Sequence, residues 1–212
     1  MAFCFPSRLY AILDVERARA AGQEPMDVLH LWLDVGVRLL QLRAKTLASG
    51  ELLSLAEQMA ARCRTAGATF IVNDRVDVAC LSPADGVHLG QDDLPPAAAR
   101  RLAGDAAVIG LSTHTDEQLA AACGAPVSYL AIGPIFSTST KSSSNANVGL
   151  DGIARAAAHA HAAGRPIVAI GGITLSTAPA VVAAGADAIA VIADLLAGDP
   201  GQRVRQYLAM LS

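Results

Sequence analysis

Short apolar runs alternate with stretches of helical periodicity along the whole chain of 212 residues. Each run is rich in strand-forming residues and ends at polar residues or glycine, and each is followed by apolar residues spaced three and four positions apart. The predicted strand and helix pairs are 8–15 with 26–36, 38–41 with 49–66, 69–72 with 76–81, 86–89 with 95–103, 107–111 with 116–123, 128–132 with 150–163, 166–170 with 176–184, and 188–192 with 202–211.

Strict alternation of this kind implies a parallel sheet with right-handed crossovers, and eight repeats allow the sheet to close on itself without edges. We therefore expect an α/β fold, a single (β/α)8 TIM barrel formed as one domain over residues 1–212. An open, doubly wound sheet is the alternative that the same alternation allows. Apolar residues make up 53% of the chain and aromatic residues 4%, which fits an aliphatic core between buried strands and helices.

The charge of the chain limits its partners. A formal net charge of −3 and a pI near 5.9 provide no basic field for nucleic acid or for an anionic membrane surface. The N-terminus lacks a leader pattern and no apolar run is long enough to span a bilayer, so we expect a cytoplasmic protein with small-molecule substrates. Assembly as a homo-oligomer is compatible with the sequence. The four cysteines are expected to be reduced thiols, and His159 and His161 to lie on a solvated helix face.

In a barrel, the active site is built at the carboxyl ends of the strands, so the residues that follow each apolar run are the candidates. Taken singly, they could be turn and capping residues or a solvated loop edge. Together, they place acidic and basic groups at one mouth, which indicates a metal and a polyanion. They are Gln41, Arg43 and Lys45 after the second run, Asn73, Asp74 and Arg75 after the third, His88, Gln91, Asp92 and Asp93 after the fourth, Ser112, Thr113 and His114 after the fifth, and Thr138, Thr140 and Lys141 in the sixth loop.

Two carboxylates and three cations in this set have a defined chemistry. Asp74 and Asp93, one βα unit apart, supply hard oxygen ligands. Mg²⁺ is commonly coordinated by such carboxylates together with substrate phosphates. Arg43, Lys45 and Lys141 would contact the remaining phosphate oxygens and neutralise a leaving pyrophosphate. Residues 137–148 form a long polar loop around Lys141, which we expect to close over the site as a lid.

A second anion site is predicted where residues 170–173 (IGGI) end the seventh run and where the eighth run ends. In this fold, the loops after strands seven and eight often hold a phosphate through backbone N–H groups, and glycine allows close approach of the backbone. A Gly-Gly pair is also a common packing device. Two anion sites would correspond to two phosphorylated substrates.

The motifs together resemble those of the thiamine phosphate synthase family. They are residues 41–45 (QLRAK), 72–79 (VNDRVDVA), 86–93 (GVHLGQDD), 133–136 (GPIF) with Thr138, Thr140 and Lys141, and 170–173 (IGGI). The resemblance covers nearly the whole chain in the order and spacing of the family. It implies a transferase that condenses hydroxymethylpyrimidine pyrophosphate with hydroxyethylthiazole phosphate, with Mg²⁺, to give thiamine phosphate and pyrophosphate.

By the same resemblance, roles are assigned residue by residue. Asp74 and Asp93 would hold the metal, and Arg43, Ser112 and Lys141 would be catalytic. The pyrimidine pyrophosphate would be bound by Gln41, Arg43, Asn73, Ser112 and Lys141, with His88 as a neighbour of the ligand. Thr138 and Thr140 would help to hold the thiazole end and close the loop, and Gly172 would bind the thiazole phosphate. Lys45, Ile192 and Ala193 complete the expected substrate-binding set. The family often has serine where this chain has Ala193, so we expect weaker phosphate binding rather than another reaction.

The expected chemistry is dissociative. The amino group of the pyrimidine stabilises a benzylic-type cation, so the bond to pyrophosphate can break before the thiazole nitrogen attacks, and catalysis consists of charge neutralisation, alignment and exclusion of water. Two alternatives remain at this stage. A thiazole tautomerase shares the barrel but needs no pyrophosphate pocket, and a non-catalytic phosphate-binding barrel has no use for a metal site.

Overall fold

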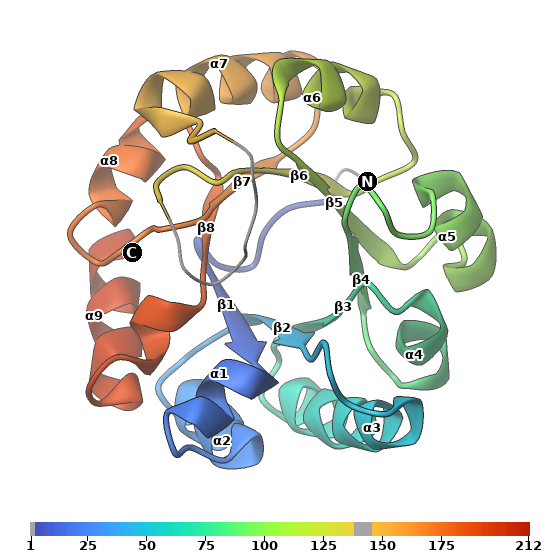
Figure 1. The fold of residues 1–212 in the computed structure, drawn as a ribbon, viewed down its shortest axis with the longest axis vertical. Coiled ribbons are helices and arrows are strands. Elements are labelled where there is room, and N and C mark those ends of the chain that lie inside the picture. Colours follow the sequence, from blue (N-terminus) through green and yellow to red (C-terminus); the bar gives the residue numbers. More distant parts are fainter. Residues whose placement is uncertain (1–2, 138–145) are drawn as a thin grey trace.

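The protein is a closed barrel of parallel strands surrounded by helices, as seen in the computed structural model, which describes residues 3–137 and 146–212 (Figure 1). Each strand pairs with the next in the sequence, and the last pairs with the first, so the barrel has no edge strand. The prediction of a (β/α)8 barrel is confirmed. The strands are β1 Leu9–Asp14, β2 Leu39–Arg43, β3 Thr69–Asn73, β4 Gly86–Leu89, β5 Val108–Thr113, β6 Tyr129–Ile132, β7 Ile167–Ile170 and β8 Ala188–Val191.

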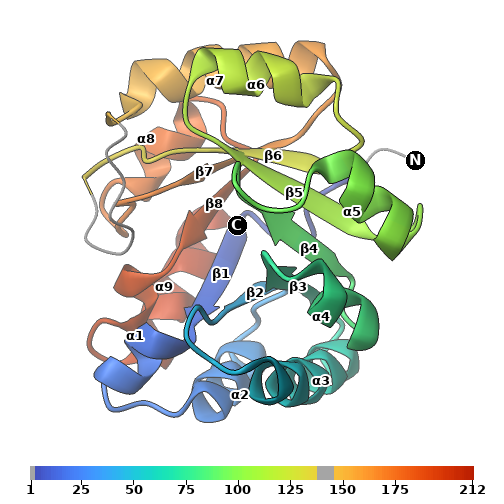
Figure 2. The ribbon, with the colours of Figure 1, turned by 45° about the vertical axis from the view of Figure 1, so that its right-hand side comes forward.

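The helices form a ring outside the strands in both views of the ribbon (Figures 1 and 2). Two short elements were not predicted, α1 and the 3₁₀ helix η1. In α1 only Val15 and Ala18 are buried, so its sequence carries little apolar periodicity. The helices are α1 Val15–Ala20, α2 Pro25–Asp34, α3 Ser49–Thr65, α4 Val76–Leu81, α5 Pro96–Ala103, α6 Asp116–Cys123, α7 Gly149–Ala162, α8 Ala178–Ala183, η1 Ala193–Leu196 and α9 Pro200–Leu211.

Side chains alternate between two cores along every strand, as the twofold period of a strand requires. One core lies between the sheet and the helices and is almost wholly aliphatic. The other fills the barrel interior and consists of Tyr10, Ile12, Leu39, Ile71, Tyr129, Ala131, Val168, Ala188 and Ala190. Phe3 and Phe5, from the segment before β1, pack against this interior core, with the ring centroids of Phe5 and Tyr129 5.2 Å apart.

Polar side chains at the amino end of the barrel tie neighbouring strands together. Asp85 accepts a hydrogen bond from the N–H of Phe70 at 2.7 Å, and Asp187 accepts one from the N–H of Ile167 at 2.7 Å. Asp85 lies just before β4, and Asp187 lies just before β8. These bonds satisfy the N–H groups of the second residue of β3 and of the first residue of β7, where the ladder begins.

Three smaller expectations can be compared with the structure. The four cysteines are free. His159 and His161 are exposed on α7, as predicted, and His161 Nε2 lies 2.8 Å from a carboxylate oxygen of Asp187. No helix among the described residues is both long and apolar enough to cross a membrane.

Gly86 in β4 provides a test of barrel packing. A Cβ atom at this position would lie 1.9 Å from the carbonyl oxygen of Val108 in β5, a backbone atom that cannot move without disturbing the strand pair. Gly86→Ala should lower the free energy of unfolding by at least about 2 kcal/mol, measured by urea denaturation. Gly50→Ala is the matched control, because Gly50 is exposed in α3 with no atom near its Cβ position, and it should cause no loss. Equal stability of the two variants would contradict this packing.

Candidate active site

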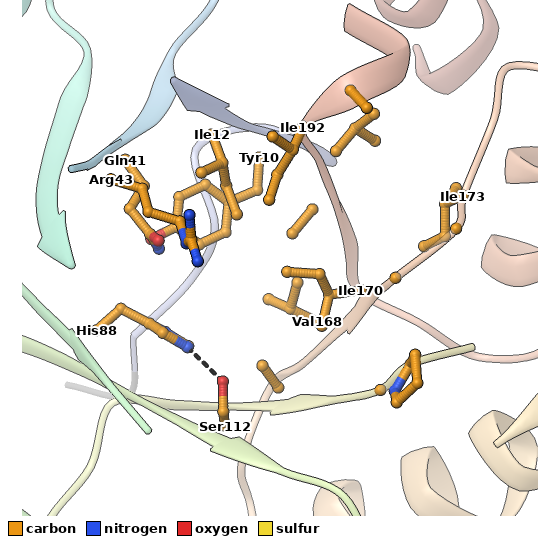
Figure 3. Close-up of a pocket in the computed structure, with 18 of the residues that line it drawn as sticks. Tyr10, Ile12, Gln41, Arg43, His88, Ser112, Val168, Ile170, Ile173 and Ile192 are labelled. Atoms are coloured by element: carbon orange, nitrogen blue, oxygen red, sulfur yellow. Dashed lines mark hydrogen bonds between the residues drawn. The ribbon is translucent and has the colours of Figure 1, made fainter. Parts of the chain in front are cut away.

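A cavity of about 430 Å³ opens at the carboxyl end of the barrel, and every strand contributes to its lining (Figure 3). Its lower wall is the apolar interior of the barrel and its rim carries the charged groups. Ten of the predicted site residues line it, namely Gln41, Arg43, Lys45, Asn73, Asp74, His88, Ser112, Gly172, Ile192 and Ala193. Thr138, Thr140 and Lys141, and with them most of the expected lid, lie outside the described residues.

The expected position of several polar residues was wrong in one respect. Arg43 was expected to follow the second strand, but it lies within β2 together with Gln41. Likewise, Asn73 lies within β3, and Ser112 and Thr113 lie within β5. Gln41 and Arg43 continue the inward face begun by Leu39. The apolar run therefore ends before the strand does, because an inward-facing side chain near the cavity can be polar without leaving the sheet.

Arg43 is held by a buried carboxylate. Its Nη1 donates to Asp14 Oδ2, and the Asp14 side chain is only 2% exposed. The other oxygen of Asp14 accepts from the N–H of Arg17 at 2.9 Å and so caps α1. Asp14 thus fixes the direction of the guanidinium and the start of the first helix at the same time.

Lys45, Asp74 and Asp93 form a charged cluster on the rim. The Lys45 ammonium contacts Asp74 Oδ2, and Asp93 Oδ2 accepts from the N–H of Gly90 at 2.7 Å. Partial burial and the neighbouring Asp74 carboxyl raise the pKa of Asp93. Asp74 is also the one non-glycine residue with positive φ, at 63°, among those the structure describes. Two carboxyl groups that disfavour each other's ionisation would be stabilised by a cation placed between them.

Glu16 holds the loop that carries Lys45. One carboxylate oxygen accepts from the N–H of Lys45 at 2.8 Å, from the N–H of Thr46 at 2.9 Å and from the Thr46 hydroxyl at 2.9 Å. Partial burial opposes ionisation of Glu16, but the hydrogen bonds from Thr46 and Lys45 outweigh it and hold the pKa of this carboxyl below its usual range. The position of Lys45 is therefore determined by α1 as well as by β2.

Five side chains form a continuous series of hydrogen bonds across the barrel interior. Gln41 Nε2 donates to Tyr10 OH at 2.8 Å, and the hydroxyls of Tyr10 and Tyr129 are 2.9 Å apart. The ring of His88 connects the hydroxyl of Tyr129, 2.9 Å from Nδ1, to Ser112 Oγ, 2.8 Å from Nε2 (Figure 3). We call these five residues the interior network. It connects Gln41 on one wall of the cavity with Ser112 on another.

The glycines after β7 bring two loops into contact. A Cβ at Gly171 would lie 2.7 Å from Pro134 Cα, and one at Gly172 would lie 2.5 Å from the carbonyl oxygen of Ser137. Both glycines have positive φ, 101° and 65°. The Gly-Gly pair is therefore a packing device, as the sequence allowed. The same two glycines also line the cavity, as do Ile192 and Ala193.

Comparison with known proteins identifies the group to which the chain is related. The profile of the thiamine monophosphate synthase family matches residues 9–195. The chain belongs to this family. A thiamine-phosphate synthase of Koribacter versatilis is 44% identical over 96% of this chain and 95% of its own length, and one of Chlorobium luteolum is 42% identical over 89% and 88%. The solved thiamine phosphate pyrophosphorylase from Pyrococcus furiosus has a TM-score of 0.85 at 29% identity and covers 96% of this chain and 95% of its own.

The family resemblance predicted from the motifs is thereby confirmed, but the motifs missed residues that the site depends on. Tyr10 and Asp14 lie in β1 and Glu16 lies in the first turn of α1, a segment from which no candidate was taken. Tyr129, which lies inside β6, was missed in the same way. The available signal was strand phase, since Ile12 and Asp14 lie two and four positions after Tyr10 and so share its inward face.

Asp14→Asn tests the link between Arg43 and the first helix. The asparagine Oδ1 can still cap α1, but its NH₂ group would face the guanidinium, donor against donor. We expect a loss of about 2 kcal/mol or more in the free energy of unfolding, and about a tenfold weaker affinity for pyrophosphate, measured by calorimetry. Asp77→Asn is the control, because its pair with Arg75 is exposed and should contribute less than about 1 kcal/mol. Unchanged pyrophosphate affinity in Asp14→Asn would remove Asp14 from the site.

Proposed function

We propose that this chain condenses hydroxymethylpyrimidine pyrophosphate with hydroxyethylthiazole phosphate to form thiamine phosphate and pyrophosphate. The observation that carries the proposal is the rim of the cavity, where Arg43, Lys45, Asp74 and Asp93 gather around one opening in a chain of this family. Cations beside paired carboxyls suit a metal-bound pyrophosphate. A tautomerase or a passive phosphate binder would have no need for this combination.

Mg²⁺ fits the donor set of the rim. Asp74 and Asp93 supply carboxyl oxygens close together, and within residues 3–137 and 146–212 no third His, Cys, Asp or Glu side chain joins them in a group that could hold a metal ion. Two protein ligands with the remainder from water and substrate phosphate is a common arrangement for Mg²⁺. When bound, the metal would neutralise charge on the leaving pyrophosphate. Arg43 would add two parallel donors and Lys45 a point charge, and Lys141 is proposed as a third cation.

The thiazole phosphate would lie on the opposite side of the cavity. There, Gly172, Ile192 and Ala193 meet at the ends of β7 and β8, and backbone N–H groups are the donors that remain when Ala193 supplies no hydroxyl. Thr138 and Thr140 are proposed to help hold the thiazole end. This arrangement would put the two anionic groups at different parts of the cavity rim. Val168 and Ile170 contribute apolar lining, and both lie across the cavity from Arg43 (Figure 3).

The reaction needs no proton transfer. The bond between the pyrimidine methylene carbon and the pyrophosphate oxygen breaks with its electron pair moving to pyrophosphate, and the thiazole nitrogen lone pair then forms the new C–N bond. The residues of this chain would hold charge on the leaving group, align the thiazole and, through the apolar wall, exclude water from the cation. Gln41, Asn73, His88 and Ser112 would orient the pyrimidine ring.

The direct test is to incubate the purified protein with both substrates, with and without Mg²⁺, and to measure thiamine phosphate and pyrophosphate, which should appear in equal amounts only with the metal. Asp93→Asn should lower the rate at least about 100-fold. Its carbonyl oxygen can still accept from the N–H of Gly90, so the fold should persist. Full activity of this variant, or of Asp74→Asn, would contradict the metal assignment.

The same variant has a second expected property, which does not require substrates. Because burial and Asp74 raise the pKa of Asp93, its ionised form is disfavoured in the fold and stability is lost as the pH rises through that pKa. Asp93→Asn should therefore be at least as stable as the parent at neutral pH without metal, and Mg²⁺ should no longer raise its melting temperature. A stabilising effect of Mg²⁺ that survives in Asp93→Asn would place the metal elsewhere.

Ala193→Ser tests the phosphate end of the cavity. A hydroxyl at this position would add one donor to the thiazole phosphate, so binding should tighten by roughly 0.5 to 1.5 kcal/mol, measured by calorimetry. Ala193→Cys is the control, because a thiol of similar size is only a weak donor and should give little gain. Unchanged or weaker binding in Ala193→Ser would show that the end of β8 does not face the phosphate.

A further inference from the structure

The proposed function does not use the two tyrosines of the interior network. Both are buried, at 1% exposure for Tyr10 and 0% for Tyr129, and buried hydroxyls are costly unless they are hydrogen-bonded. Gly110 leaves the space that Tyr129 and His88 occupy. A Cβ atom at this position would lie 2.2 Å from Tyr129 Cζ and 2.4 Å from His88 Nδ1, too close for either side chain to stay in place. Phe3 and Phe5 cover the Tyr129 ring on the other side. The barrel therefore keeps two buried hydroxyl groups next to the site.

One hydrogen bond of the interior network has a fixed donor, and the direction of the others can be argued from it. The Gln41 NH₂ group can only donate, so Tyr10 accepts from it and has its own proton for Tyr129. Burial raises the pKa of both phenols, so each keeps its proton. Among the described side chains, Tyr129 is the one acceptor within reach of the Tyr10 proton, so donation from Tyr10 to Tyr129 leaves neither buried phenol proton without a partner. The Tyr129 proton then points to His88 Nδ1.

The remaining steps follow from the chemistry of imidazole. In a neutral ring, one nitrogen accepts while the other carries the hydrogen. If Nδ1 accepts from Tyr129, then Nε2 carries the hydrogen and donates it to Ser112 Oγ, 2.8 Å away. The Ser112 oxygen is thus occupied as an acceptor, and its own proton points elsewhere. Ser112 lines the cavity, so a ligand acceptor there can receive that proton.

We propose that the interior network runs in one direction and that Tyr129 is its positioning residue, which holds His88 as the Nε2–H tautomer and leaves the Ser112 hydroxyl as a donor to the ligand. The matching ligand group is an aromatic ring nitrogen with a lone pair. A pyrimidine has such a nitrogen, and to this extent the inference rests on the proposed function. The opposite direction would turn Ser112 into an acceptor and would not suit this group.

The direction can be measured without any substrate. In ¹⁵N-labelled protein, long-range ¹H–¹⁵N spectra distinguish the protonated from the unprotonated ring nitrogen of each of the five histidines, and His88→Gln identifies the His88 signals. The parent should show His88 as a single Nε2–H tautomer. In Tyr129→Phe and Tyr10→Phe, the direction is no longer imposed and the Nδ1–H form should become populated. The phenylalanine ring retains the packing against Phe5 in Tyr129→Phe.

Tyr207→Phe is the matched control. Tyr207 is the third tyrosine of the chain, fully buried in α9, and its hydroxyl donates to Asp194 Oδ2 at 2.6 Å, outside the interior network. Its loss should leave the His88 tautomer as in the parent. The proposal is overturned if His88 in the parent is anything other than Nε2–H, or if Tyr10→Phe and Tyr129→Phe both retain the single Nε2–H form.

Activity gives a second, separate measurement. Tyr129→Phe should lower kcat/KM for the pyrimidine pyrophosphate about tenfold, as expected for one misdirected hydrogen bond, while KM for the thiazole phosphate stays unchanged. An equal effect on both substrates would mean a general structural role and would overturn the positioning role. If the protein made no thiamine phosphate at all, the proposed function would fail, but the tautomer result would stand independently.

Discussion

A polar side chain that points into a closed barrel has to find its partners inside that barrel, because the sheet has no edge and the surrounding wall is apolar. The interior network and the pair formed by Asp14 and Arg43 follow from this requirement. In both cases, a group that faces the cavity is held by one that lies deeper. The deeper group fixes the orientation of the exposed one, and such support is what a precise site needs. The chemistry of the rim therefore depends on residues that never reach it.

Carboxylates in this protein hold cations and backbone at the same time. Asp14 caps α1 and holds Arg43, Glu16 holds the backbone and side chain of the loop that carries Lys45, and Asp93 accepts from Gly90 beside Asp74. Positive and negative groups consequently alternate around the mouth. A rim made only of cations would bind a polyanion and retain the product, whereas interleaved carboxylates limit the excess charge and give a divalent cation its ligands.

The sequence was sufficient for the fold because eight apolar runs of the right period leave few ways to bury both faces of a sheet. The sequence was also sufficient to place Lys45, Asp74 and Asp93 on the rim of the cavity, because each of them follows a predicted strand. It was insufficient for Tyr10 and Tyr129, which look like ordinary members of apolar runs until strand phase places them inside the barrel. Gln41 and Ser112 were found by motif, but their position within the strands depends on partners far away in the sequence, and no local pattern contains that information.

The aromatic seal formed by Phe3 and Phe5 has a consequence for exchange with solvent. These two rings cover Tyr129 at the amino end, while Ser112 faces the cavity at the other end. The buried hydroxyl groups of Tyr10 and Tyr129 would therefore exchange hydrogen with solvent from the cavity side. A ligand seated on Ser112 would cover that side, so this exchange should be slower in the occupied protein than in the empty one.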